Sequence, residues 1–158
     1  MQLSEDMKRV VLEQRLGFVA TVTPDGRPNL SPKGTTTVLD DGHLMFLDIA
    51  SPGTVDNLST NPFVEINVVD PILRKGYRFK GLATVVVSGE AFDTALAAAR
   101  RHGFTTSRER VRSIVIVEVT SAAALVSPAY DLGATEDDVS SAWAERFAEL
   151  HSTHLRPR

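Results

Sequence analysis

The sequence predicts a mostly β protein with flanking helices, in which six antiparallel strands form a small closed or split barrel. Six stretches rich in β-branched residues lie along the 158 residues, and only two helices are expected between the first strand and the last. Each parallel return would need its own crossover helix, so two internal helices are too few for a parallel sheet. Barrel closure also removes exposed strand edges, which would otherwise favour aggregation.

The first half of the chain predicts one helix and three strands. Leu3–Arg15 has apolar residues near helical spacing, with Ser4 as its expected N-cap and Gly17 as its expected stop. The three strands that follow are expected at Phe18–Thr23, Asn29–Leu39 and His43–Ile49. The short loops between them contain Asp-Gly, which favours an antiparallel meander.

The second half predicts three more strands and three more helices. Ser51–Leu58 is expected to be a short helix, with Ser51 at the N-cap and Pro52 at its first position. Strands are expected at Phe63–Val69, Tyr77–Val87 and Ser113–Thr120, and helices at Gly89–His102 and Glu136–His151. In the last helix, apolar residues recur on the face of Trp143, which we expect to cover apolar surface at or near a subunit interface.

Composition excludes several classes of function. The chain has no cysteine, so disulfides, thiolate nucleophiles and cysteine-based metal sites are absent. It carries 17 basic against 20 acidic residues, a formal charge of −3, which argues against a nucleic-acid partner. No apolar run is long enough to cross a membrane, and the first residues are acidic where a signal peptide would be basic. We therefore expect a cytoplasmic protein with no membrane partner.

No catalytic residue can be named from the sequence. The four histidines, His43, His102, His151 and His154, have no serine or carboxylate partner at a spacing that indicates a catalytic triad. His151 and His154 lack a third ligand for a metal, and no metal site is expected. The acidic pair at Asp40 and the acidic run from Glu136 fit a turn and the first turn of a helix.

Three segments are candidates for ligand binding. In the first, Lys33 and Gly34 interrupt a β-prone stretch, which indicates either a strand kink or a close approach of ligand to backbone. In the second, the helix start at Ser51 offers free N–H groups to an anion, although a plain helix cap would look the same. In the third, Arg74–Lys80 has four basic residues and no acid, which suits either a solvated strand face or a cofactor phosphate.

Several spaced motifs together resemble the pyridoxamine 5′-phosphate oxidase-like family, whose fold is the FMN-binding split barrel. The motifs lie at residues 18–28, 44–48, 54–58, 61–64 and 76–83. They follow one another in the family's order from about residue 5 to residue 126. The tail and helix at 127–158 are similar to those of a subgroup of short members. The resemblance implies one split-barrel flavin-binding domain over residues 1–158.

The resemblance also implies a homodimer with FMN in each of two clefts between the subunits. The candidate cofactor-binding residues are Lys33, Gly34, Thr35, Thr36, Leu47, Asp48, Ile49, Ser51, Gly53, Thr54, Asn57, Lys75 and Arg78. The family commonly has a basic residue where this chain has Gly53. Lys33, Lys75 or Arg78 could supply the missing charge. The arginine and histidine motif of true pyridoxamine phosphate oxidases has no counterpart, which argues against vitamin B6 oxidation.

The resulting functional hypothesis is an FMN-dependent oxidoreductase that acts on a small-molecule substrate. The flavin would supply the redox chemistry, which explains why no acid, base or nucleophile stands out. Two alternatives remain open on the same fold. One is a reductase that uses the deazaflavin F420, whose long acidic tail would meet the basic stretch at Arg74–Lys80. The other is a flavin-binding or storage protein without turnover.

Overall fold

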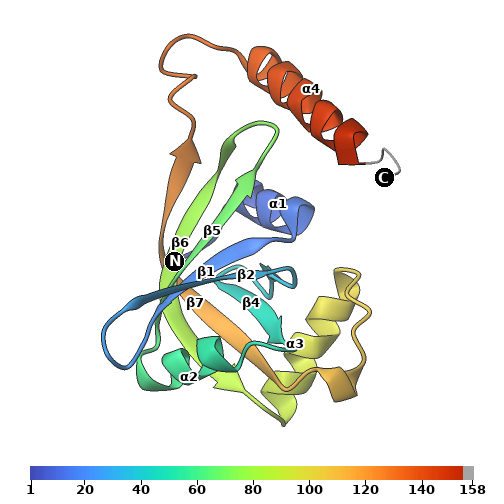
Figure 1. Ribbon diagram of the computed structural model, residues 1–158. Helices are drawn as coiled ribbons and strands as arrows, with labels where there is room; N and C mark the ends of the chain where they lie inside the picture. Colours follow the sequence, from blue (N-terminus) through green and yellow to red (C-terminus); the bar gives the residue numbers. More distant parts are fainter. Residues whose placement is uncertain (155–158) are drawn as a thin grey trace.

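A curled antiparallel sheet of seven strands forms the centre of the computed structural model, which describes residues 1–154. The strand order is β2-β1-β5-β6-β7-β4-β3, and the sheet forms a half-barrel with helices around it (Figure 1). The strands are β1 Gly17–Val22, β2 Pro28–Lys33, β3 Thr37–Val38, β4 His43–Asp48, β5 Phe63–Asp70, β6 Lys75–Val86 and β7 Ser113–Val126. The helices are α1 Glu5–Gln14, α2 Pro52–Thr60, α3 Glu90–Arg101 and α4 Glu136–His154, with a 3₁₀ turn at Arg108–Arg110.

The prediction of six strands was wrong because the stretch Asn29–Leu39 is two strands. The chain turns between Lys33 and Thr37, where the backbone N–H of Thr36 donates to the carbonyl oxygen of Lys33 at 3.3 Å. The hydroxyl of Thr36 donates to the same oxygen at 2.9 Å. Gly34 therefore belongs to a turn that separates β2 from β3, and the sheet has seven strands.

The predicted antiparallel pairing of the first three stretches is present, but the second stretch is divided between the two edges of the sheet. β2 pairs with β1, whereas β3 and β4 lie at the opposite edge of the sheet. Three residues, Gly34 to Thr36, join the two edge strands β2 and β3. Such a short link requires the sheet to curl until its edges approach each other. The split of the barrel therefore lies at Lys33–Thr37.

The first helix begins as predicted and ends differently. The Ser4 hydroxyl accepts a hydrogen bond from the N–H of Met7 at 3.2 Å, which confirms the N-cap. The helix ends at Arg15, which adopts a left-handed φ of 53°, and Gly17 is the first residue of β1. A Cβ at Gly17 would lie 2.5 Å from the Thr36 hydroxyl oxygen. Gly17 therefore allows the β2–β3 turn to pack against β1, and the prediction that it stops the helix was wrong.

Strand β4 is buried on both of its faces. Leu44 and Phe46 belong to a core on the side of α1, whereas Met45 and Leu47 pack in a second core with α3. The two cores explain why β4 is continuously apolar rather than alternating. The strand ends at Asp48, which is 4% exposed. Asp48 thus brings a buried carboxylate to the end of this apolar strand.

The end of the chain runs away from the sheet. Strand β7 continues to Val126, six residues beyond the expected end, and pairs with the basic part of β6. Figure 1 shows α4 beyond the hairpin that joins β5 to β6. In α4, Val139 is buried and the Trp143 ring lies 4.1 Å from the guanidinium of Arg74 in that hairpin. Within residues 1–154, no helix is long and apolar enough to span a bilayer.

Candidate functional site

The side chain of Lys33, at the end of β2, is buried at the split of the barrel. It is 5% exposed, and its Nζ donates hydrogen bonds to the hydroxyls of Ser31 and Ser51, each at 2.7 Å. The ammonium also lies 5.9 Å from the centre of the Phe46 ring. A buried lysine needs such partners because burial removes it from water. The structure thus places a cation at the start of α2.

The residues at the start of α2 are arranged around this lysine. Ser51 is the N-cap residue, but its hydroxyl makes no capping hydrogen bond and accepts from Lys33 instead. The N–H of Ser51 donates to the Asp48 carboxylate at 2.8 Å, and the Ser113 hydroxyl donates to the same carboxylate at 3.3 Å. Asp48 therefore fixes the loop before α2, and the N–H groups of the first turn are left for another acceptor.

The electrostatics at Lys33 are set by burial and by Asp48. Burial lowers the pKa of the Lys33 ammonium below its ordinary value of 10.5, because the low-dielectric interior disfavours the charged form. The negative charge of Asp48 opposes this effect and favours the charged form. A buried amine with a perturbed pKa next to a helix N-terminus is a candidate for anion binding.

Two glycines leave open space near Lys33. A Cβ added at Gly34 or at Gly53 would meet no atom within 4 Å. Thr35, between Gly34 and the core, is fixed because its hydroxyl donates to the Leu47 carbonyl at 3.2 Å and accepts from the Leu47 N–H at 3.0 Å. The turn is therefore rigid on the side of β4 and open at Gly34.

Four other predicted residues hold the start of α2 and the β2–β3 turn in position. Thr54 and Asn57 are buried, and the Asn57 side-chain amide donates to the Thr21 hydroxyl in β1 at 3.0 Å. This bond joins α2 to the sheet. Ile49 is half-buried and packs against the core beneath α3. Thr36 is fully buried in the turn. These side chains position the helix start and the turn.

The two basic residues predicted from β6 contact other parts of the chain. The Lys75 Nζ lies 2.6 Å from the Glu136 carboxylate at the start of α4. The Arg78 guanidinium lies 2.9 Å from the Glu65 carboxylate on the neighbouring strand β5. Of the three cations proposed to replace the charge missing at Gly53, Lys33 is the one that contacts the start of α2, through the Ser51 hydroxyl.

Sequence reasoning missed two residues of the site, Ser31 and Ser113. Ser31 could have been found, because residues two apart in a strand share a face and Ser31 precedes Lys33 by two. Ser113 lies 65 residues from Asp48, and only the pairing of β4 with β7 brings them together. No local signal in the sequence indicates that contact.

Comparison with known proteins identifies the family. Residues 3–125 match the model of the pyridoxamine 5′-phosphate oxidase family. No curated protein matches the chain. The solved structure of HupZ from Group A Streptococcus is 28% identical, with a TM-score of 0.69, over 79% of this chain and 95% of that one.

Two more distant structures share the fold. A structure named F420 reductase is 22% identical, with a TM-score of 0.60, and covers 77% of this chain and 98% of its own. An FMN-binding protein from Syntrophomonas wolfei subsp. wolfei is 14% identical, with a TM-score of 0.58, and covers 78% of this chain and 91% of its own. These likenesses support the split-barrel fold, and the family match confirms the resemblance read from the spaced motifs. The chain belongs to the pyridoxamine 5′-phosphate oxidase family.

Proposed function

We propose that the protein is an FMN-dependent oxidoreductase, whose cofactor phosphate is bound at the start of α2. The observation that carries the proposal is the buried Lys33, whose ammonium is hydrogen-bonded to Ser51 at that helix start. Burial of a lysine is unfavourable unless a partner compensates it. A bound phosphate would supply a stronger partner than the two serine hydroxyls do.

The backbone at the start of α2 adds to this attraction. The first turn of a helix has N–H groups without acceptors inside the helix, and its dipole favours a negative charge. Here these groups belong to Gly53 and Thr54, because Pro52 has no N–H. The Ser51 side chain does not cap them. Lys33 and these N–H groups together offer a phosphate both charge and directed hydrogen bonds.

We place the flavin ring beside the turn at Gly34. The open side of Gly34 lets a flat ring approach the backbone, and the Thr35–Leu47 hydrogen bonds hold that backbone in place. When bound, FMN would supply electron or hydride transfer. The chain's own residues would bind the phosphate, orient the ring and limit its contact with water.

We further propose that the protein acts as a homodimer with the cofactor at the subunit interface. The outer face of the sheet exposes a group of large apolar side chains. They are Phe18 at 41% exposure, Val22 at 37%, Leu30 at 65%, Phe63 at 68% and Leu82 at 37%. A shallow groove of about 470 Å³ lies on this face beside Phe63. A second copy of the chain would remove this apolar surface from water.

An F420-dependent reductase is the second candidate, because a structure named F420 reductase shares this fold. The acidic tail of F420 would have to meet the basic stretch Arg74–Lys80. Lys75 already contacts Glu136, and both Arg78 and Lys80 contact Glu65. We favour FMN because the buried cation Lys33 lies at the start of α2, where we place the cofactor phosphate, and not in this basic stretch.

Mass spectrometry of the small molecule that copurifies with the protein tests the proposal first. FMN is the expected molecule, and F420 would reverse the order of the two candidates. Anaerobic reduction of the bound flavin by NAD(P)H, followed by reoxidation with candidate acceptors, then separates an enzyme from a storage protein. A flavin that no donor reduces would support storage.

A variant of α2 tests the position of the cofactor. Thr54→Leu places an apolar side chain at the buried first turn and is expected to weaken FMN retention. The matched control is Thr60→Leu, at the exposed end of the same helix. The control should retain FMN as the wild type does. Equal flavin occupancy in Thr54→Leu and Thr60→Leu would reject the assignment of the phosphate to this helix start.

A further inference from the structure

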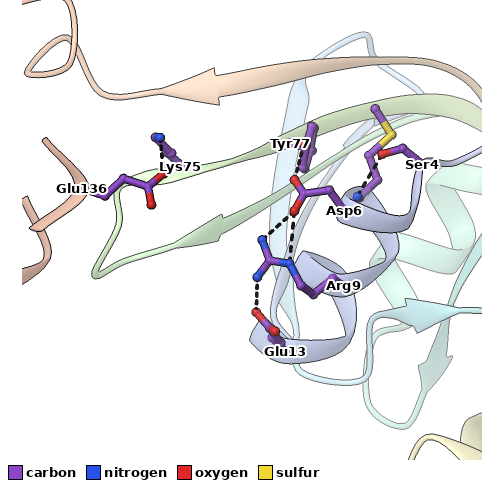
Figure 2. Close-up of polar contacts among 8 residues, drawn as sticks. Ser4, Asp6, Arg9, Glu13, Lys75, Tyr77 and Glu136 are labelled. Atoms are coloured by element: carbon purple, nitrogen blue, oxygen red, sulfur yellow. Dashed lines mark hydrogen bonds and ion pairs between the residues drawn. The ribbon is translucent and has the colours of Figure 1, made fainter.

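A second cavity, of about 390 Å³, has none of the residues Lys33–Thr37 of the barrel split in its lining. It is lined by α1, the start of β6, the end of β7 and the tail before α4. Figure 2 shows its polar groups as two sets: Lys75 with Glu136, and Tyr77 with Asp6 and Arg9. A volume of this size is ordinary for a small-molecule site.

Two tyrosines and several aliphatic residues form the apolar part of the lining. The hydroxyl of Tyr130 donates to the Leu73 carbonyl at 2.7 Å, and the hydroxyl of Tyr77 donates to the Asp6 carboxylate at 2.5 Å. Both rings are therefore fixed by their polar ends. Val10 and Val126 line the same cavity. These residues offer a flat or bulky apolar group a surface on which to pack.

Two of the three carboxylates in the lining are bound within the fold. Asp6 accepts hydrogen bonds from Tyr77 and Arg9, and these two donors lower the pKa of the Asp6 carboxyl. Asp70 accepts from the backbone N–H groups of Ile72 at 2.8 Å and Leu73 at 2.9 Å, and so fixes the turn between β5 and β6. Neither carboxylate requires a further cation.

The third carboxylate, Glu136, comes from a different segment of the chain. It lies at the start of α4, 61 residues from Lys75, and its Oε1 accepts a hydrogen bond from the Lys75 Nζ at 2.6 Å. Lys75 also lies 4.2 Å from the centre of the Tyr130 ring. The side chains of Lys75 and Glu136 are 35% and 61% exposed, so another carboxylate can replace Glu136 at little cost.

We propose that this cavity binds a small aromatic carboxylate, for which Glu136 is the competitor built into the chain. The ligand carboxylate replaces Glu136 at Lys75, whereas Arg9 keeps its ion pairs with Asp6 and Glu13. Its ring packs against the two tyrosines and the valines. Displacement of Glu136 frees the Lys75 ammonium for the ligand carboxylate. Asp6 and Asp70 keep their hydrogen-bond donors within the chain. The ammonium of Lys75 is therefore the group that favours a carboxylate over an uncharged analogue of the same shape.

Titration with 2-naphthoate and its uncharged analogue 2-naphthamide, followed by calorimetry, tests this proposal. Naphthoate is expected to bind wild-type protein more tightly than naphthamide. The variant Glu136→Gln should bind naphthoate several-fold more tightly than wild type, and Lys75→Gln should bind it about tenfold less tightly. Glu145→Gln, which changes an exposed acid on the same helix, is the matched control and should bind as the wild type does.

The experiment also separates this cavity from the proposed FMN site. Titration of naphthoate in excess FMN should leave its affinity unchanged, whether or not FMN itself binds. Equal affinities for naphthoate and naphthamide, or an unchanged affinity in Lys75→Gln, would overturn the proposal. Displacement of naphthoate by FMN would overturn it as well, because the probe would then occupy the cofactor site.

Discussion

Replacement of Lys33 by methionine separates the binding role of this lysine from a structural one. Methionine has nearly the same length as lysine and no charge, and the side chain to be replaced is 5% exposed. The change removes two hydrogen bonds, to Ser31 and Ser51, and the ammonium that we assign to the cofactor phosphate. Stability and FMN affinity should respond in different ways.

The free energy of unfolding should change little. Loss of two hydrogen bonds costs about 1–3 kcal/mol, at about 0.5–1.5 kcal/mol each. Removal of a buried ammonium relieves a desolvation penalty that amounts to several kcal/mol in protein interiors. The two effects oppose each other, so Lys33→Met should be as stable as the wild type or more stable, in the absence of cofactor.

The sign of the pH dependence follows from the pKa of Lys33. This pKa is lower in the folded protein than its ordinary value of 10.5, so the unfolded chain binds more protons between the two values. In that window the unfolding free energy of the wild type rises with pH relative to that of Lys33→Met. The advantage of the variant is therefore largest at neutral pH and disappears as the pH approaches 10.5.

FMN affinity should fall substantially in the same variant. A hydrogen bond to a charged group contributes about 1.5–3 kcal/mol, which corresponds to a loss of about 10- to 100-fold in affinity. Flavin fluorescence titration measures the affinity, and urea unfolding measures the stability of the same preparation. Lys8→Met, which removes the same charge from α1, is the control. A strongly destabilised Lys33→Met with unchanged FMN affinity would refute the reasoning.

Three further predictions follow from single residues. Gly53→Arg restores the basic residue common in the family at a position where a Cβ meets nothing within 4 Å, so FMN affinity by fluorescence should rise about tenfold, and no rise would contradict the α2 site. Gly76→Ala places a Cβ 2.1 Å from the Val68 carbonyl oxygen, so the unfolding free energy should fall by about 3 kcal/mol, and a neutral effect in urea unfolding would contradict this packing. Phe63→Lys charges an apolar side chain that is 68% exposed, so light scattering should show loss of the proposed dimer. A Phe63→Lys variant with the wild-type mass in solution would exclude this face as the interface.

Local sequence patterns predicted the elements well where one segment contains all the information. The Ser4 hydroxyl accepts a hydrogen bond from the N–H of Met7, only three residues away. The alternation of buried and exposed residues likewise marks strands such as β5 and β6. The family resemblance was readable for the same reason, because its motifs are short and follow one another in a fixed order. Residues 3–125 then matched the family model.

The division between β2 and β3 could not be predicted from these patterns. A glycine inside a β-prone stretch is compatible with a bulge, a ligand contact or a turn. The choice depends on whether the segment before Gly34 pairs with β1 and the segment after it pairs with β4. These two pairings lie at opposite edges of the sheet. A short window of local sequence contains no information about either of them.

For a related reason, the sequence could not show whether Lys33, Lys75 or Arg78 supplies the positive charge at the start of α2. Lysine is usually exposed, so burial of Lys33 is not expected from its residue type. The partners of Lys75 and Arg78, Glu136 and Glu65, come from the tail and from the neighbouring strand. Only the register of β5 with β6 and the path of the tail bring these carboxylates to the two cations.

The ratio of FMN affinity to riboflavin affinity tests the phosphate site most directly. The two molecules share the flavin ring and differ in the phosphate, so their ratio isolates the contribution of Lys33 and the start of α2. We expect wild-type protein to bind FMN at least about tenfold more tightly than riboflavin, since charged hydrogen bonds contribute about 1.5–3 kcal/mol. Equal affinities for the two flavins would contradict the assignment of this site to a cofactor phosphate.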